Sequence, residues 1–245
     1  MKIDDFRSEF ANNTKTWKWE VEGILDNQGY VHPIDLDTKV ISTVFERLSS
    51  PVLRSISKNH GYKVETANQT TYPDFTLSKF TDDVLVSRIA LDVKTTYVSN
   101  SMNFTLGSYN SFIRNNTKNI LYPYNTYSEH WILGFVYRQE NAFDEYDLDN
   151  MPIRGQISCP YSDVYWFIRR KQDICGLRAG SGNTKNIGSI KVSQPSDFAT
   201  KKGPFTQFSK SKEACDHFWA NYENYLSEIG TDNQLIQHID FQRFK

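Results

Sequence analysis

The chain has 245 residues, of which 38% are hydrophobic and 14% are aromatic. This content of bulky apolar residues excludes an intrinsically disordered protein, and the length fits one folded domain, which we expect to span residues 1–245. The 28 basic and 29 acidic residues give a formal net charge of −1, so net charge alone neither indicates nor excludes a polyanionic partner.

The amino-terminal sequence and the cysteines predict a cytoplasmic protein. No apolar run approaches the roughly 18 residues that a membrane-spanning helix needs, and residues 1–6 lack the apolar segment of a secretory signal. The three cysteines, Cys159, Cys175 and Cys215, are odd in number and widely spaced, which is typical of a reducing compartment and not of a disulfide framework. We therefore expect no membrane partner.

Charge is distributed unevenly along the chain. Residues 161–212 contain ten Lys or Arg and three Asp, a surplus of seven positive charges, whereas residues 140–149 contain five acids and no base. A basic segment in an otherwise neutral chain fits a protein that binds a polyanion with one face. An ordinary solvated surface is the alternative that the charge pattern leaves open.

The first regular element in chain order is helical. Between Asp37 and His60 apolar residues recur on one helical face. Ser50-Pro51 reads as an N-cap followed by proline at the first helical position, so we expect two consecutive helices, the second ending at Gly61. Glu46 lies off the apolar face, and this pattern alone makes it an ordinary exposed carboxylate.

Strands are expected in the middle of the chain, where β-branched and aromatic residues are enriched. They are residues 72–77, 89–98, 130–137 and 163–169. We expect a connection over residues 146–160, a loop over residues 179–183 and an amphipathic helix over residues 218–226. Helix, then strands, then helix predicts an α/β or α+β fold with a mixed sheet.

Two of these strands, residues 72–77 and 89–98, carry charged side chains of functional interest. Side chains alternate between the faces of a strand, so Leu91 and Val93 share an apolar face while Asp92 and Lys94 share the other. A carboxylate and an ammonium in a strand that otherwise resembles core must be paired or must bind an ion. Asp74 lies at the start of the preceding strand, on the face opposite Phe75.

Two converging carboxylates are suitable ligands for a hard divalent cation such as Mg²⁺, which takes few protein groups and retains waters and phosphate oxygens. A lysine beside them can hold or activate water, so the group as a whole predicts a metal-dependent phosphodiester hydrolase. The alternative is a structural Asp–Lys pair on a half-exposed strand. The Pro-Asp and Asp-x-Lys pattern is short, and by itself it leaves both interpretations open.

The arrangement resembles the PD-(D/E)xK nuclease superfamily and, more closely, the EcoRV family of type II restriction endonucleases. The resemblance runs in order through most of the chain and is weak over residues 137–178 and after residue 230. The segments that carry it are Asp37–Val40, Phe45–Glu46, His60–Tyr62, Tyr72–Leu77, Lys94–Tyr97, Phe104–Gly107, Ser111–Ile120, His130–Ile132, Ala179–Thr184 and Asn186–Ile190. It implies a restriction-endonuclease-like core, in which helices flank a mixed central sheet and the N-terminal part contributes to a dimer interface.

The resemblance also implies a role for each candidate site residue. Asp74 and Asp92 would be Mg²⁺ ligands, Lys94 would position or activate the attacking water, and Glu46 would be an accessory acid near the metal. Residues 180–186 would form a base-reading loop in the major groove, with Asn183 offering both a donor and an acceptor. The residues expected to contact DNA are Gly180, Ser181, Gly182, Asn183, Thr184, Lys185, Asn68, Gln69, Thr70, Thr95, Thr96, Ser111 and Lys118.

The function that the resemblance implies is that of a homodimeric, Mg²⁺-dependent type II restriction endonuclease in a bacterial cytoplasm. It would cut both strands of duplex DNA at a short palindrome of the GATATC kind, leaving blunt 5′-phosphate ends. A cognate DNA methyltransferase would belong to the same system without forming a stable complex.

Two alternatives remain open. The first is a superfamily nuclease of DNA repair or junction resolution, for which no base-reading loop is expected. The second is a non-catalytic DNA-binding protein, which predicts a broken acidic–Lys triad, although Asp74, Asp92 and Lys94 are all present.

Overall fold

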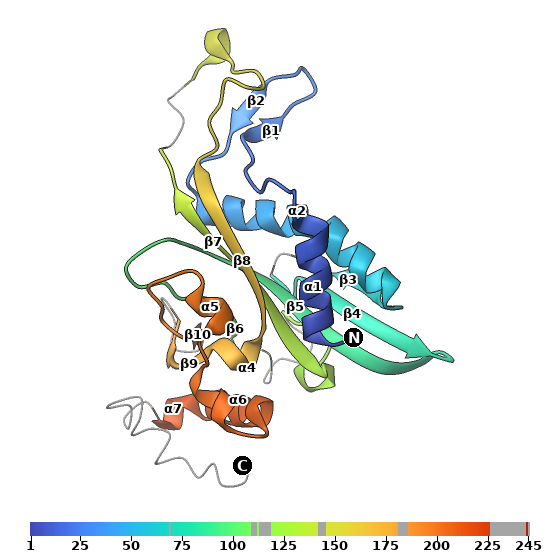
Figure 1. Cartoon of the computed structure of the whole chain (residues 1–245). Helices are drawn as coiled ribbons and strands as arrows, with labels where there is room; N and C mark the ends of the chain where they lie inside the picture. Colours follow the sequence, from blue (N-terminus) through green and yellow to red (C-terminus); the bar gives the residue numbers. More distant parts are fainter. Residues whose placement is uncertain are drawn as a thin grey trace.

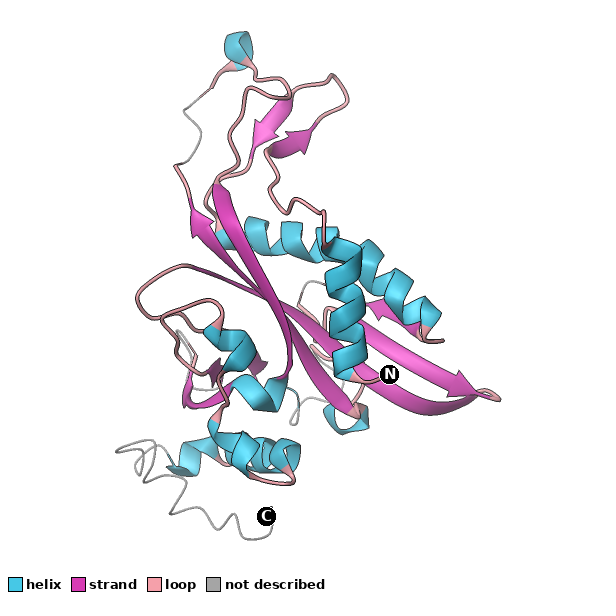
Figure 2. Cartoon of the chain, in the orientation of Figure 1, coloured by secondary structure: helices cyan, strands magenta, loops and turns pink. Residues whose placement is uncertain are grey.

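The computed structural model describes residues 1–68, 70–108, 112, 119–141, 146–180, 186–225 and 244. Its framework is a five-stranded mixed sheet (Figures 1 and 2). In spatial order the strands are β3 (Lys63–Thr66), β4 (Phe75–Thr81), β5 (Val84–Tyr97), β7 (Glu129–Gln139) and β8 (Tyr161–Arg170). β5 and β7 pair in parallel and the other neighbours pair antiparallel. The predicted mixed α/β (α+β) class is confirmed.

Two long helices, α1 (Ile3–Thr14) and α2 (Thr38–Asn59), cover one face of this sheet (Figure 1). Their apolar faces bury aromatic rings against the strands; for example, Phe45 of α2 stacks on Phe135 of β7 with ring centroids 4.5 Å apart. Leu91 and Val93 of β5 belong to this core. The odd-numbered face of β5 therefore lies against the two helices, as the alternation predicts.

A second core lies on the opposite face of the sheet and includes Ala90, Ile132 and Phe167. It is covered by a small antiparallel sheet and short helices (Figure 1). The strands are β6 (Thr105–Ser108), β10 (Asn186–Ser189) and β9 (Cys175–Ala179). The helices are α4 (Lys171–Ile174), α5 (Asp197–Thr200), α6 (Ser211–Ala220) and α7 (Tyr222–Tyr225). The even-numbered face of β5, with Asp92 and Lys94, points to this side.

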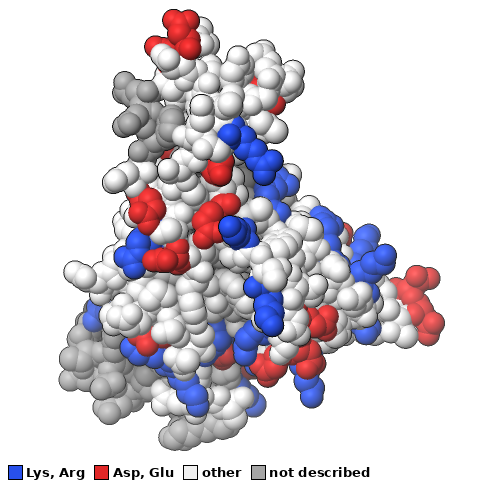
Figure 3. All heavy atoms as spheres, turned by 45° about the horizontal axis from the view of Figure 1, so that its top comes forward, with Lys and Arg blue, Asp and Glu red and all other residues white. Residues whose placement is uncertain are grey.

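Two hairpins extend beyond the layers (Figure 1). Strands β1 (Gly23–Leu25) and β2 (Val31–Pro33) form one of them, beside residues 146–156. The other is the β4–β5 hairpin, whose turn places Asp82 and Asp83 at positive φ. On the face shown in Figure 3, acidic side chains mark the tips of both projections, and basic and acidic side chains are mixed between them. The 3₁₀ turns are η1 (Tyr124–Thr126), η2 (Leu148–Asn150) and η3 (Pro204–Gln207).

The prediction of two helices between Asp37 and Gly61 was wrong, because α2 runs without a break through Pro51. Proline removes one backbone donor from a helix. Phe45 before it and Leu53 after it are nevertheless fully buried in the same core, so packing on both sides outweighs the lost hydrogen bond. The predicted end is confirmed, since Gly61 follows the helix in the left-handed region with φ +72°.

The basic segment 161–212 is not simply a surface feature. Arg169 is 9% exposed and its guanidinium donates hydrogen bonds to the carbonyls of Phe198 and Ala199. Lys171 is buried as well. Part of the local charge surplus therefore acts inside the fold.

Among the described residues, no helix combines the length and the apolar character that a membrane span requires.

Candidate active site

The pairing of β4 with β5 brings Asp74 and Asp92 together. Phe75 pairs with Leu91 in this antiparallel ladder, so the register continued by one residue sets Asp74 opposite Asp92. Residues directly opposite each other in such a ladder have neighbouring side chains. Asp74 Oδ2 also accepts a hydrogen bond from the backbone N–H of Val93 at 2.7 Å, which holds this carboxylate against β5.

Lys94 completes the cluster from the same face of β5. Its Nζ lies 2.6 Å from Oδ2 of Asp92. The Asp92 side chain is 4% exposed and that of Lys94 is 25% exposed, so the carboxylate is enclosed while the ammonium reaches solvent. The structure thus brings Asp74, Asp92 and Lys94 together, as the alternation of β5 and the start of β4 predict.

The environment of Asp92 fits a cation. Its buried Oδ2 forms an ion pair with the ammonium group of Lys94 at 2.6 Å and accepts no other hydrogen bond from the described residues. Buried carboxylates are unfavourable unless positive groups bind them, and the single ammonium group of Lys94 faces the carboxyl groups of both Asp92 and Asp74. No cluster of three or more His, Cys, Asp or Glu suited to a metal ion occurs in the described part of the chain. Mg²⁺ needs only one or two carboxylates when water and phosphate oxygens complete its shell.

The charges of the cluster act on one another. Burial, together with the nearby charge of Asp92, raises the pKa of Asp74 to about 8, against the opposing effects of Lys94 and the Val93 N–H. Burial by itself lowers the pKa of Lys94, but the carboxylates of Asp92 and Asp74 outweigh it and the net effect is a raised pKa. Lys94 therefore keeps its proton near neutral pH.

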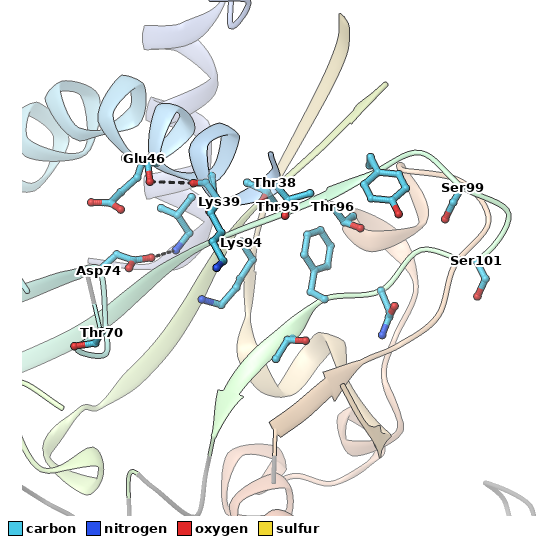
Figure 4. Close-up of a pocket in the computed structure, with 17 residues that line it drawn as sticks. Thr38, Lys39, Glu46, Thr70, Asp74, Lys94, Thr95, Thr96, Ser99 and Ser101 are labelled. Carbon is cyan, nitrogen blue, oxygen red and sulfur yellow. Dashed lines mark hydrogen bonds between the residues drawn. The ribbon is translucent and has the colours of Figure 1, made fainter. Parts of the chain in front are cut away.

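Glu46 of α2 faces the same polar cleft as Asp74 and Lys94 (Figure 4). The helical pattern alone predicted an exposed carboxylate, whereas the side chain is half-buried. Lys39 also lines the cleft and was missed by the sequence analysis. The signal that could have identified it is spacing, because Lys39 precedes Glu46 by two helical turns and so lies on the same helix face.

The predicted DNA contacts divide into four groups. Thr70, Thr95 and Thr96 line the cleft beside the carboxylates, while Asn68 is exposed and does not line it. Gly180 is buried at the end of β9, where a Cβ would lie 2.7 Å from Oγ1 of Thr105. The remaining predicted contacts, Gln69, Ser111, Lys118 and Ser181–Lys185, lie outside the described residues.

A mixed sheet that places two carboxylates and a lysine beside a polar cleft is the arrangement of a PD-(D/E)xK nuclease. Comparison with known proteins identifies the family. The chain matches the family model described as "Restriction endonuclease EcoRV" over residues 15–245, and it belongs to that family. It is 42% identical over 223 residues to the type II restriction enzyme EcoRV of Escherichia coli, an alignment that covers 88% of this chain and 86% of that protein. The protein is therefore a site-specific deoxyribonuclease.

Proposed function

We propose that the protein is a Mg²⁺-dependent type II restriction endonuclease that cuts both strands of duplex DNA at a short palindrome. The observation that carries the proposal is the convergence of Asp74, Asp92 and Lys94 at a polar cleft, where one ammonium group faces two carboxyl groups. Asp74 and Asp92 would hold the ion, with Glu46 as an accessory acid. When bound, Mg²⁺ supplies positive charge to the scissile phosphate and lowers the pKa of water.

The chain's own groups orient the reactants. Lys94 reaches the cleft with a protonated ammonium group that can donate hydrogen bonds to the attacking water and to a phosphate oxygen. Thr95 and Thr96 follow it on alternate faces of β5 and both line the cleft, where their hydroxyls can bind the DNA backbone. Together these residues favour in-line attack that leaves a 5′-phosphate.

Sequence recognition is assigned to the loop that follows β9. We infer that residues 180–186 enter the major groove and that Asn183 reads a base edge, since an amide offers a donor and an acceptor together. The site would be a six-base-pair palindrome of the GATATC kind, cut at its centre to give blunt ends, as the sequence resemblance implies. Asn68, Gln69 and Thr70 would approach the minor groove, and Ser111 and Lys118 the phosphates.

A palindrome cut on both strands calls for a two-fold dimer with one active site per strand. The projecting unit formed by the β1–β2 hairpin and residues 146–156 beside it supports a homodimer, because it exposes large apolar side chains. Leu25 is 65% exposed, Leu148 is 91% exposed and Ile153 is 50% exposed. We propose that this unit is the dimer contact. The enzyme would act in a bacterial cytoplasm beside a cognate methyltransferase that it does not bind stably.

The proposal is tested by digesting a plasmid of known sequence with the purified protein and Mg²⁺, and by sequencing the ends. Uniform blunt 5′-phosphate ends at one palindrome are the expected result. Asp92→Ala should abolish cleavage while duplex binding survives, because it removes an ion ligand without removing apolar core. Cuts scattered over many sequences would favour a repair-type nuclease of the same superfamily, and an active Asp92→Ala variant would contradict the assigned site.

A further inference from the structure

Lys171, at the start of α4, is a buried lysine that the proposed mechanism does not use. It is 2% exposed, and its Nζ has no hydrogen-bond partner within the described part of the chain. Lysine is among the residues least often buried without a partner, because removing an ammonium group from water is strongly unfavourable. Its position therefore calls for a compensating interaction.

Three aromatic rings surround the ammonium group. Nζ of Lys171 lies 5.1 Å from the ring centroid of Tyr72 and 5.3 Å from those of Phe112 and Tyr124. Tyr72 and Phe112 also stack on each other, with centroids 4.4 Å apart. Cation–π attraction to several rings offsets part of the lost hydration. We call these three rings the ring cage.

The ring cage adjoins the catalytic cluster along the sheet. Lys171 follows the last residue of β8 at the start of α4 and lines one small cavity with His130, and His130 pairs with Ala90 of β5. Ala90 is two residues before Asp92 and therefore faces the same side. Lys171 thus lies across β7 from β5, one row along the sheet from Asp92 and on the interior side of the cluster.

Tyr72 provides a second connection. Its backbone leads through Pro73 directly into Asp74, and its hydroxyl lies 2.7 Å from Nδ1 of His130, within hydrogen-bond distance. The ring that packs against Lys171 is therefore two residues from one carboxylate. Any shift of this ring would be passed to Asp74 through two peptide units.

The charged groups that act on Lys171 include Asp92 of the catalytic cluster. The other charged groups that face it are Asp216 and Lys212 of α6, which pair with each other at 3.0 Å. Burial lowers the pKa of Lys171, and the charge of Asp92 is the main opposing influence. On the other side, the carboxyl groups of Asp74, Asp92 and Glu46 lie beside Lys94, and Lys39 lines the same cleft.

We propose that Lys171 is a positioning residue for DNA cleavage, which supports Asp74 and Asp92 from the interior through its charge and its ring cage. The inference rests on the proposed nuclease function. An unpaired buried charge lowers stability, and functional sites are where such a cost is commonly found. Removal of the charge should consequently raise the stability of the fold and slow DNA cleavage. A purely structural role predicts instead that cleavage is lost only when stability is lost.

The test compares Lys171→Met and Lys171→Arg with the parent, using single-turnover cleavage of cognate duplex at saturating Mg²⁺, duplex binding without metal, and urea unfolding. Lys171→Met keeps the apolar stem and should slow cleavage by about tenfold or more, with binding within about twofold of the parent and an equal or higher urea midpoint. Lys171→Arg should retain most of the cleavage rate because it keeps the charge.

Lys79→Met is a matched control, because its Nζ also lies over a tyrosine ring, 5.6 Å from Tyr62, but away from the cleft. It should cleave like the parent. Parent-like cleavage by Lys171→Met, a loss that follows reduced stability, or equal losses in the Met and Arg variants would each overturn the inference. A parent protein that cuts no DNA would instead reject the proposed nuclease function.

Discussion

Asp74 and Asp92 illustrate how a functional site opposes folding at the scale of single residues. Two mostly enclosed carboxylates face each other across a ladder, with one lysine in direct contact. Like charges at this separation disfavour simultaneous ionisation, which is why the pKa of Asp74 is raised to about 8. The metal-free chain is therefore strained electrostatically at the place where the proposed ion would bind.

This strain predicts that Asp74→Asn raises the stability of the metal-free protein, by an amount that depends on pH. A carboxyl whose pKa is higher in the folded chain stabilises the fold at low pH, and this contribution is lost as the pH rises from about 4 to about 8. The amide oxygen of Asn can still accept the Val93 N–H. We expect urea unfolding with EDTA to show the variant more stable than the parent at pH 8.5, by on the order of 2 kcal/mol.

The same comparison at pH 4 is the internal control, because Asp74 is then neutral in the folded parent and only about half ionised in the unfolded chain, so little of the pH-dependent contribution has been lost. The stability difference should shrink as the pH falls. A difference that stays constant between pH 4 and pH 8.5 would show that Asp74 does not titrate as its surroundings require.

How far single residues could be predicted depended on the kind of pattern. Alternation along one strand was sufficient for Asp92 and Lys94, because both positions belong to one element. Helical periodicity misplaced Glu46, since a helix face turned away from its own core can still face a neighbouring strand. Only the resemblance to a family placed that residue near the cluster, and the position of Lys39 required the tertiary structure.

At the scale of elements, long patterned segments were predicted and short ones were not. The strands β4, β5, β7 and β8 were located, with ends that differed by several residues. Helix α1 was missed, although Ile3, Phe6 and Phe10 are spaced for one buried face. Strands β6, β9 and β10 are four or five residues long, too short for alternation to be distinguished from chance.

One element-scale prediction concerns the packing of β7 between β5 and β8. Gly134 pairs with Lys94 on one side and with Phe167 on the other, and a Cβ there would lie 2.2 Å from the Phe167 ring. Gly134→Ala should destabilise the fold by about 1–3 kcal/mol through overpacking. Phe167→Leu should lower the free energy of unfolding less in the Gly134→Ala variant than in the parent, as measured by urea unfolding. Strictly additive effects would mean that the ring does not restrict this position.

A second element-scale prediction separates base reading from phosphate binding. Asn183→Ala should lose cleavage at the cognate site while weak, salt-sensitive binding to any duplex survives, because base contacts discriminate and phosphate contacts do not. Lys118→Ala should weaken binding to all sequences and reduce the salt slope by up to about one unit. The measurement is competition binding across a salt series. If Asn183→Ala keeps the selectivity of the parent, residues 180–186 do not read the base sequence.

At the scale of the whole molecule, the two extended hairpins differ in the role assigned to them. We expect Leu25→Asp to disrupt the homodimer, because a charge replaces a side chain that is 65% exposed in the isolated chain on the proposed contact. Light scattering should then report a monomer, and double-strand cleavage should fall. Val84→Asp is the matched control, since Val84 is 64% exposed on the β4–β5 hairpin. A dimeric Leu25→Asp variant would place the contact elsewhere.

The hydrogen bond between Val93 and Asp74 gives the molecule an internal spectroscopic probe. The nitrogen and proton resonances of a peptide group respond to the charge of the oxygen that it binds, so the Val93 amide signal in a heteronuclear NMR spectrum reports on Asp74 directly. Isotope labelling of valine alone would make this signal accessible. Ion titrations could then be followed at a single backbone position in the absence of DNA, which separates occupancy of the site from catalytic turnover.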